Sequence, residues 1–245
     1  NESSTTVRHE VAALAEVCHA AGSLVVVDAV SSLGGAEFCT DAWGIDVVVA
    51  GSQKCLMLPP GLSFLAISEA AWQRMEEVRS PRYYLDLKRY RKSAGRRETP
   101  YTPAVSLIMG LRESLRLIRD EGLPAVWERH RLMQQMIRRG LEALGLELLV
   151  SERFASPTVT AAYGPAGMDV DAWRKQVNDY TGVLLSGGQA QLAGRIFRVG
   201  HMGYATPLEM LATLAALEIG LAAAGSPVKR GAGVAAAEEV WLAWQ

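Results

Sequence analysis

Two side chains that are suited to carbonyl chemistry, Asp28 and Lys54, each follow a run of three valines. Asp28 comes directly after residues 25–27, and Lys54 lies shortly beyond residues 47–49. Each run predicts a buried strand, and open α/β sheets bind ligands beyond the carboxyl ends of their parallel strands. An amine attacks carbonyl carbons only after it loses its proton, and the apolar stretch at 55–61 favours that loss.

The same pair also has simpler interpretations. Asp28 and Lys54 could form an ordinary ion pair, because each charge needs a partner when it is buried. Asp28 could equally cap a turn or a helix. A pyridoxal cofactor, in contrast, needs both residue types: a lysine for its Schiff base and an acid on the pyridine nitrogen to keep the ring an electron sink. The spacing alone leaves these alternatives open.

The elements that must position the pair alternate between helix and strand. Helical spacing over 9–21 precedes strand signals at 23–30, 44–52 and 62–69, followed by a helix at 69–78. This alternation predicts an α/β fold with a mostly parallel sheet covered by helices.

The second half of the chain has a different pattern of predicted helices and strands. We predict an irregular excursion at 79–103, because it is rich in Arg, Lys, Tyr and Pro, and two strong helices around a boundary near 122–124. Further on we expect α+β structure, with strands at 146–150, 157–164 and 194–200 and a helix near 170–181. Thr206, Pro207 and Glu209 predict a capping box that starts the last long helix. The expected domains are 1–122 and 123–245.

Composition limits the possible partners. The chain has 245 residues, a formal net charge of −1 and 49% hydrophobic residues, so neither a nucleic-acid partner nor a membrane is expected. The basic cluster at 87–98 is interpreted as a solvated loop near a subunit interface rather than an RNA site. Three cysteines without paired spacing indicate neither a disulfide framework nor a metal site, and they fit a cytoplasmic setting.

Several segments together resemble a known family. "NESSTTV", "VVVDAVSSLGG", "AWGIDVVVAGSQKCLMLPPGLSFLAIS" and "GRIFRVGHMG" resemble the class V aminotransferases of fold type I, in particular the alanine–glyoxylate (serine–pyruvate) aminotransferase branch. The resemblance runs through nearly the whole chain. It implies the C-terminal part of the large domain of the pyridoxal-phosphate (PLP) transferase fold, followed by the smaller C-terminal α+β domain.

The resemblance also implies roles for three residues near the strand ends. Lys54 matches the lysine that forms the Schiff base with PLP, and Asp28 matches the aspartate bonded to the pyridine nitrogen. Gln53 matches a glutamine that contacts the cofactor, although a glutamine at a strand end could merely cap a backbone group. His201, Met202 and Cys55 are expected to be packing residues.

Three more roles are implied at sites that are distant in sequence. Ser3 matches a serine near the phenolic oxygen of the cofactor, and Thr102 matches a threonine that reaches the cofactor phosphate of a neighbouring subunit. Arg198 matches the arginine that holds the substrate carboxylate, for which a guanidinium offers two parallel hydrogen bonds. Ser3 could instead be a turn residue, Thr102 part of an ordinary extended dipeptide, and Arg198 the partner of a structural carboxylate.

Two departures from the family are visible. Thr6 stands where the family usually has glycine, so an altered backbone is expected there. Family members also begin well upstream of "NESST" and carry there the phosphate-binding loop and the aromatic residue that stacks on the pyridine ring. The chain therefore looks N-terminally truncated, and weak or no activity is expected for residues 1–245 alone.

The resemblance implies a homodimeric transaminase with its active site at the subunit interface. It would move an amino group from alanine or serine to glyoxylate or pyruvate by a ping-pong Schiff-base mechanism. A class V lyase such as a cysteine desulfurase is a rival, although such relatives usually have His where this chain has Gln53. A second rival interpretation is a catalytically silent fragment or subunit, because some bacterial relatives carry hydrogenase-subunit names.

Overall fold

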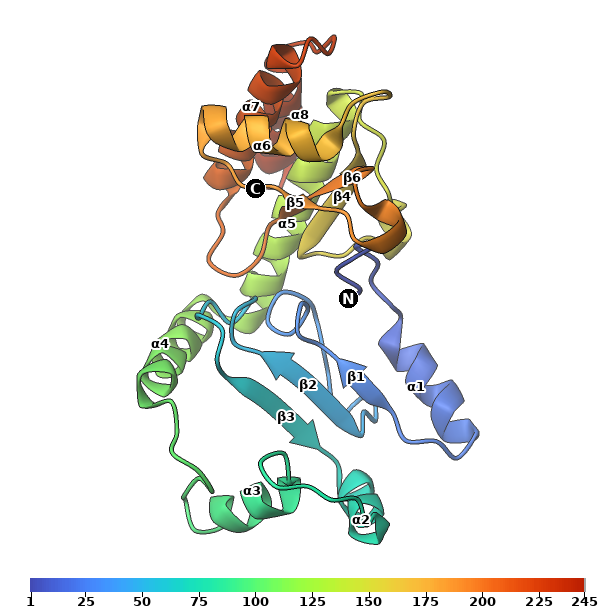
Figure 1. Cartoon of the computed structure of the whole chain (residues 1–245), viewed down its shortest axis with the longest axis vertical. Helices are drawn as coiled ribbons and strands as arrows, with labels where there is room; N and C mark the ends of the chain where they lie inside the picture. The colour runs from blue at the N-terminus through green and yellow to red at the C-terminus, as the bar shows by residue number, and fades with distance from the viewer. Residues whose placement is uncertain (245) are drawn as a thin grey trace.

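The computed structural model describes residues 1–244, which form two units, one above the other in Figure 1. The lower unit is built on a three-stranded sheet with the order β1 (Val26–Asp28), β2 (Val47–Gly51), β3 (Ser63–Ile67). β1 and β2 are parallel, and β3 is antiparallel to β2. The helices of this unit are α1 (Val11–Ala20), α2 (Glu69–Glu77), α3 (Leu87–Ala94) and α4 (Val105–Glu121). The α/β architecture predicted from the sequence is confirmed.

The upper unit packs helices against a second, antiparallel sheet with the order β4-β6-β5. Its elements are α5 (Leu123–Ala143), β4 (Val159–Tyr163), α6 (Val170–Thr181), β5 (Ser186–Gly187), β6 (Ile196–Gly200), α7 (Pro207–Ala223), α8 (Ala232–Ala243) and the 3₁₀ turns Glu152–Phe154 and Ala190–Leu192. Met133, Ile137, Phe197 and Leu214 are fully buried in its core. Burying side chains of this size stabilises a fold by roughly 1.5–3 kcal/mol each. No helix within residues 1–244 is long and apolar enough to cross a membrane.

The local sequence pattern predicted α7 correctly, but no helix was predicted where α8 lies. The Thr206 side chain accepts the Glu209 N–H, and the Glu209 side chain accepts the Thr206 N–H, so the predicted capping box is confirmed. The N-terminus of α8 is capped by a distant residue instead. The buried Glu218 carboxylate accepts the N–H groups of Gly231, Gly233 and Val234 at 2.5, 2.9 and 3.3 Å. A carboxylate in this place also interacts favourably with the helix dipole.

Two predictions about local structure were wrong. The excursion at 79–103 contains α3, which begins where the Asp86 side chain accepts the Lys88 N–H at 3.2 Å and which is fastened by a 3.2 Å ion pair from Arg91 to Glu69. Residues 146–150 form no strand and contribute only a single bridge, Leu148–Ala162. Two backbone hydrogen bonds, from the Leu149 N–H to the Ala161 carbonyl at 3.0 Å and from the Tyr163 N–H to the Glu147 carbonyl at 2.8 Å, join this segment to β4. The carbonyl of residue 150 accepts a hydrogen bond from the Arg138 side chain at 3.0 Å instead of from a strand.

β1 also differs from the expectation of a strand that is buried on both faces. Among residues 1–244 it pairs only with β2, so it lies at an edge of the sheet. Val26 is 66% exposed as a result, whereas Val48 in the central strand is buried. The run of valines was read correctly as a strand, but its burial depends on neighbours that a local pattern does not reveal.

The two units meet at the carboxyl ends of β1 and β2, which point toward the upper unit in Figure 1. The extreme N-terminal residues lie in this junction: Val7 bridges Ala155, and the Ser156 N–H donates to the Thr6 carbonyl at 3.0 Å. Gly122, with a positive φ of 88°, separates α4 from α5 at the boundary predicted from the sequence. The division into domains at this residue stays a prediction.

Thr6 occupies a conformation that glycine prefers. Its φ is 60° and its side chain is 2% exposed, in a turn that is closed by a 2.8 Å hydrogen bond from the Glu2 N–H to the Val7 carbonyl. The backbone therefore keeps a left-handed residue at this position although the side chain is β-branched. Such a residue carries strain of roughly 1–2 kcal/mol.

Replacing Thr6 with glycine is expected to raise the free energy of unfolding by about 1 kcal/mol, because relief of the strain outweighs the loss of a small buried side chain. Denaturant unfolding would measure this. The neighbour Thr5 is not among the residues with positive φ, so Thr5→Gly is the matched control and should destabilise the fold. Equal destabilisation by both substitutions would contradict the argument.

Candidate active site

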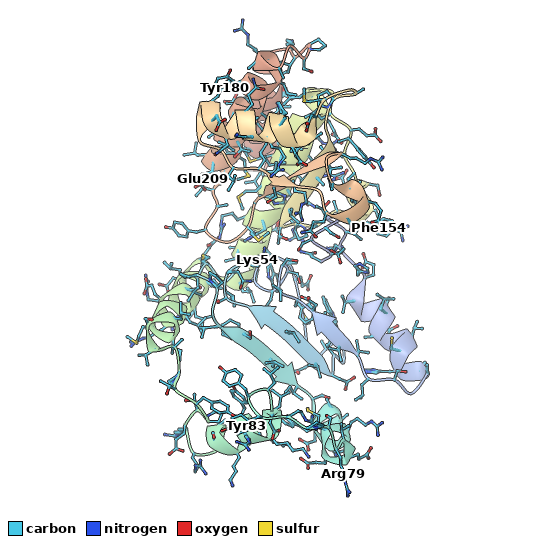
Figure 2. All side chains as sticks on the ribbon, in the orientation of Figure 1. Lys54, Arg79, Tyr83, Phe154, Tyr180 and Glu209 are labelled. Carbon is cyan, nitrogen blue, oxygen red and sulfur yellow. The ribbon has the colours of Figure 1, made fainter. Side chains whose placement is uncertain are left out.

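Asp28 and Lys54 lie at one edge of the first sheet. Asp28 pairs with Val49 in the parallel register, and the next residue, Ala29, donates its N–H to the Val49 carbonyl at 2.8 Å. Lys54 follows the end of β2 at Gly51. Figure 2 shows Lys54 at the junction of the two units, near the lower end of α5. Both side chains thus stand where open α/β sheets bind ligands.

The Lys54 side chain is half-buried, and its amine has no partner. Its Nζ makes neither a hydrogen bond nor an ion pair within 4.0 Å with residues 1–244, so the structure does not show the plain Asp28–Lys54 ion pair. The backbone around it is fixed: Met57 donates to the Lys54 carbonyl at 2.9 Å, and Leu58 donates to the Ser52 carbonyl at 3.1 Å. A fixed turn therefore carries an amine that is available to a ligand.

Asp28 and Gln53 are both exposed. The Oδ1 of Asp28 accepts the Val30 N–H at 2.9 Å, which is the turn-capping role considered above, and its Oδ2 has no partner in the described part of the chain. A Cβ added at Gly51 would come within 2.7 Å of the Oε1 of Gln53, so the glycine makes room for this side chain. Gln53 caps no backbone group in residues 1–244, which removes the simpler interpretation of that residue.

Ser3 and Arg198 are brought together although they are distant in sequence. The Oγ of Ser3 donates to the Oγ of Ser31 at 2.8 Å, in the loop that follows Asp28. The Nη1 of Arg198 donates to the Ser3 carbonyl, and its Nε donates to the Gly187 carbonyl at 2.8 Å. The structure therefore connects the loop after β1 to β6 through residue 3.

The Arg198 guanidinium keeps donors for a ligand. Its Nη2 has no hydrogen-bond partner among residues 1–244, and no carboxylate of that stretch pairs with it, unlike the structural pairing considered from the sequence. Burial lowers the pKa of Arg198, the nearby cation Arg174 adds to this effect, and Glu2 opposes it. A half-buried cation with unused N–H groups is suited to an anionic ligand such as a carboxylate.

Thr102 is not brought to this site. Its side chain is exposed just before α4 and makes no hydrogen bond with the rest of residues 1–244. The role implied for it concerns the cofactor of a neighbouring subunit, which a single chain does not test. That role stays a prediction.

A buried hydrogen-bond network joins the two units and was missed in the sequence. Thr158, fully buried before β4, donates to the Ser31 carbonyl at 2.8 Å, while Ser156 lies 3.0 Å from the same hydroxyl. Asn1 donates to both the Ser31 carbonyl and the Thr158 hydroxyl at 2.9 Å. The only signal was the presence of small polar residues in segments that are otherwise apolar, "DAVSSLGG" and "SPT".

Of the three residues that were expected to be packing residues, Cys55 and His201 are buried and Met202 is half-buried. Cys55 is 2% exposed, and burial raises the pKa of its thiol to about 12, so the thiolate needed of a nucleophile is disfavoured. His201 is 0% exposed, with its Nε2 2.9 Å from the Thr160 hydroxyl. Their interpretation as packing residues is confirmed. No group of three or more His, Cys, Asp and Glu side chains within residues 1–244 is arranged to hold a metal ion.

His201 makes the fold sensitive to acid. Burial lowers its pKa to about 3, whereas a histidine in an unfolded chain titrates near 6.5. Between these values the unfolded chain binds a proton that the folded chain does not, so stability falls as the pH falls. This group is expected to contribute a loss of about 2 kcal/mol in the free energy of unfolding between about pH 7 and about pH 5.

Denaturant unfolding at both pH values would test this dependence. In His201→Gln the loss should be smaller by about that amount. In the control His9→Gln, which alters an exposed histidine, the loss should match that of the unmodified chain. The same acid sensitivity in all three proteins would overturn the assignment.

Comparison with known proteins agrees with this geometry. The family described as "Aminotransferase class-V" matches residues 1–204. The chain is 41% identical to the soluble hydrogenase small subunit of Synechococcus sp. (strain PCC 6716), over 98% of this chain and 63% of that protein. It is 37% identical to the serine–glyoxylate aminotransferase of Methylorubrum extorquens, over 97% of this chain and 61% of that protein.

A solved structure gives the same result. The pyridoxamine–pyruvate aminotransferase of Mesorhizobium loti superposes with a TM-score of 0.93 at 37% identity, covering 97% of this chain and 62% of that one. The chain thus spans less than two thirds of the length of these relatives. The family match extends over most of the chain and includes Asp28, Lys54 and Arg198. The chain therefore belongs to the class V aminotransferases and has their fold type I architecture.

Proposed function

We propose that the protein is a PLP-dependent transaminase that moves an amino group from a small amino acid, alanine or serine, to glyoxylate or pyruvate. The observation that carries this proposal is the half-buried Lys54 amine, which has no partner in residues 1–244 and lies at the same sheet edge as Asp28. Relatives named for glyoxylate and pyruvate support the choice of acceptor.

The residues present fit PLP. Lys54 supplies an unpaired amine, and Asp28 has one carboxylate oxygen that its turn does not use. Ser3 and Gln53 add a hydroxyl and an amide at the same edge. These are the groups required to bind the aldehyde and the ring nitrogen of the cofactor. When bound, the cofactor supplies an electron sink for the carbanion that forms at the substrate Cα.

Each residue of the site has a separate role in the proposed mechanism. Arg198 grips the substrate carboxylate through its free N–H groups and so fixes the direction of the Cα–H bond. The Lys54 amine would hold the aldehyde of the cofactor and, when released from it, would serve as the base for the proton on the substrate Cα. Asp28 would hold the ring nitrogen and favour its protonated form. Ser3, through its carbonyl, sets the distance between Arg198 and the loop after β1.

The assembly and setting also form part of the proposal. A homodimer with shared active sites would give Thr102 the neighbouring cofactor that its implied role requires. The three cysteines are free thiols, which agrees with a cytoplasmic location.

The test uses the complete protein loaded with PLP. Alanine plus glyoxylate should yield pyruvate and glycine, and serine plus glyoxylate should yield hydroxypyruvate and glycine, both followed by chromatography. Release of sulfide from cysteine without an acceptor would favour a desulfurase instead. Failure to turn over any donor would favour the silent subunit that a hydrogenase-named relative suggests.

A further inference from the structure

Gly203 lies directly against the turn that carries Lys54. A Cβ added at Gly203 would come within 3.2 Å of the Lys54 carbonyl and 3.4 Å of the Met57 Cγ. Gly203 has a φ of 74°, in the left-handed region that favours glycine. The backbone of the loop after β6 is therefore packed against the lysine turn with no space between them.

The N–H of Gly203 is held by a buried histidine of α5. It donates to the Nε2 of His130 at 3.1 Å, and the Nδ1 of His130 lies 2.7 Å from the Val126 carbonyl. A carbonyl only accepts and an N–H only donates, so His130 must carry its proton on Nδ1 and be neutral. Burial lowers the pKa of His130, which agrees with this tautomer.

The carbonyl of Gly203 is held by the adjacent residue of the same helix. The Nη1 of Arg129 donates to the Gly203 carbonyl at 3.0 Å and to the Ala205 carbonyl at 2.8 Å. The other side of its guanidinium is fixed by two hydrogen bonds to Glu121, at 2.7 and 3.0 Å. Two neighbouring side chains of α5 thus hold both polar groups of one glycine.

We propose that Arg129 and His130 are positioning residues for Lys54: through Gly203 they press the turn that carries the lysine into place. As a statement about catalysis this rests on the proposed transaminase function. The loop that they hold connects directly to β6, which carries Arg198. The same pair of residues therefore fixes the lysine and the start of the segment that follows the substrate-binding arginine.

Hydrogen exchange of the complete protein, measured without cofactor, tests the physical coupling. The reporters are the Met57 and Leu58 amides, whose hydrogen bonds close the lysine turn. His130→Leu leaves the Gly203 N–H without an acceptor, so both amides should exchange at least about tenfold faster. His130→Gln, which can present an oxygen near the position of Nε2, should restore most of the protection. Arg129→Met provides a second variant with the same expected direction.

A control separates this coupling from a general loss of stability. Glu218→Gln weakens the cap at the start of α8. This cap lies at the end of the upper unit that is remote from the junction with the lower unit (Figure 1). The Met57 and Leu58 amides should therefore stay protected in this variant. Unchanged exchange in both His130→Leu and Arg129→Met, or equally faster exchange in Glu218→Gln, would overturn the proposal.

A second readout connects the coupling to the cofactor. The rate at which PLP becomes covalently attached to Lys54, trapped with borohydride and measured by mass spectrometry, should fall about tenfold or more in His130→Leu and recover in His130→Gln. An unchanged rate would overturn the catalytic part of the inference. If the unmodified protein attaches no PLP, the proposed function fails, while the exchange result still decides whether the residues position the turn.

Discussion

Replacing Lys54 with alanine is expected to lower the rate of transamination at least about 10⁴-fold, because the proposed mechanism assigns to Lys54 both the covalent link to the cofactor and the general base. No other lysine lies on the β1 and β2 edge of the sheet within residues 1–244. The measurement is single-turnover conversion of alanine to pyruvate by the PLP-loaded protein.

Two comparisons make this result specific. Lys175→Ala, which removes an exposed lysine from α6, should retain full activity. A small primary amine added to Lys54→Ala should recover part of the rate, because it supplies the missing base from solution. The proposed role would fail if Lys54→Ala kept more than about one hundredth of the rate, since loss of a general base alone costs about 10²–10⁴-fold.

Replacing Arg198 with methionine is expected to lower kcat/KM for alanine by about 10²–10³-fold, because the substrate carboxylate loses a charge-assisted grip in a half-buried site. Most of the loss should appear in KM, and PLP should still attach to Lys54. The matched control is Arg195→Met, which changes an exposed arginine just before β6.

The substrate itself supplies a sharper control. An amine without a carboxylate should react at similar, low rates with the unmodified protein and with Arg198→Met, because neither can use the missing contact. Should the variant lose as much activity toward that amine as toward alanine, Arg198 would have a structural role. The contacts that such a structural role would use are its hydrogen bonds to the Ser3 and Gly187 carbonyls.

The elements that the sequence predicted well are those with local causes. The capping box of Thr206 and Glu209 acts within one turn, and runs of valine indicate strands wherever they occur. α8 was missed because its sequence is rich in Ala and Gly and its cap, Glu218, comes from another helix. The exposure of β1 was likewise invisible, because it depends on which strands pair with it.

In the candidate site, too, features with local causes could be predicted and contacts between distant residues could not. Asp28 and Lys54 could be located by their distance from strand ends, without knowledge of the fold. The contact of Ser31 with Thr158 spans 127 positions, and no local pattern connects two such ordinary residues. Arg198 was recognised from its motif, but its attachment to the backbone of residue 3 required coordinates.

The edge position of β1 has an electrostatic consequence. Asp28 is open to water there, and opposite charges 4 Å apart attract by only about 1 kcal/mol in water, against about 4 kcal/mol at an effective dielectric constant near 20. A ligand that displaces water from this carboxylate would therefore strengthen the attraction between Asp28 and a cationic group of that ligand.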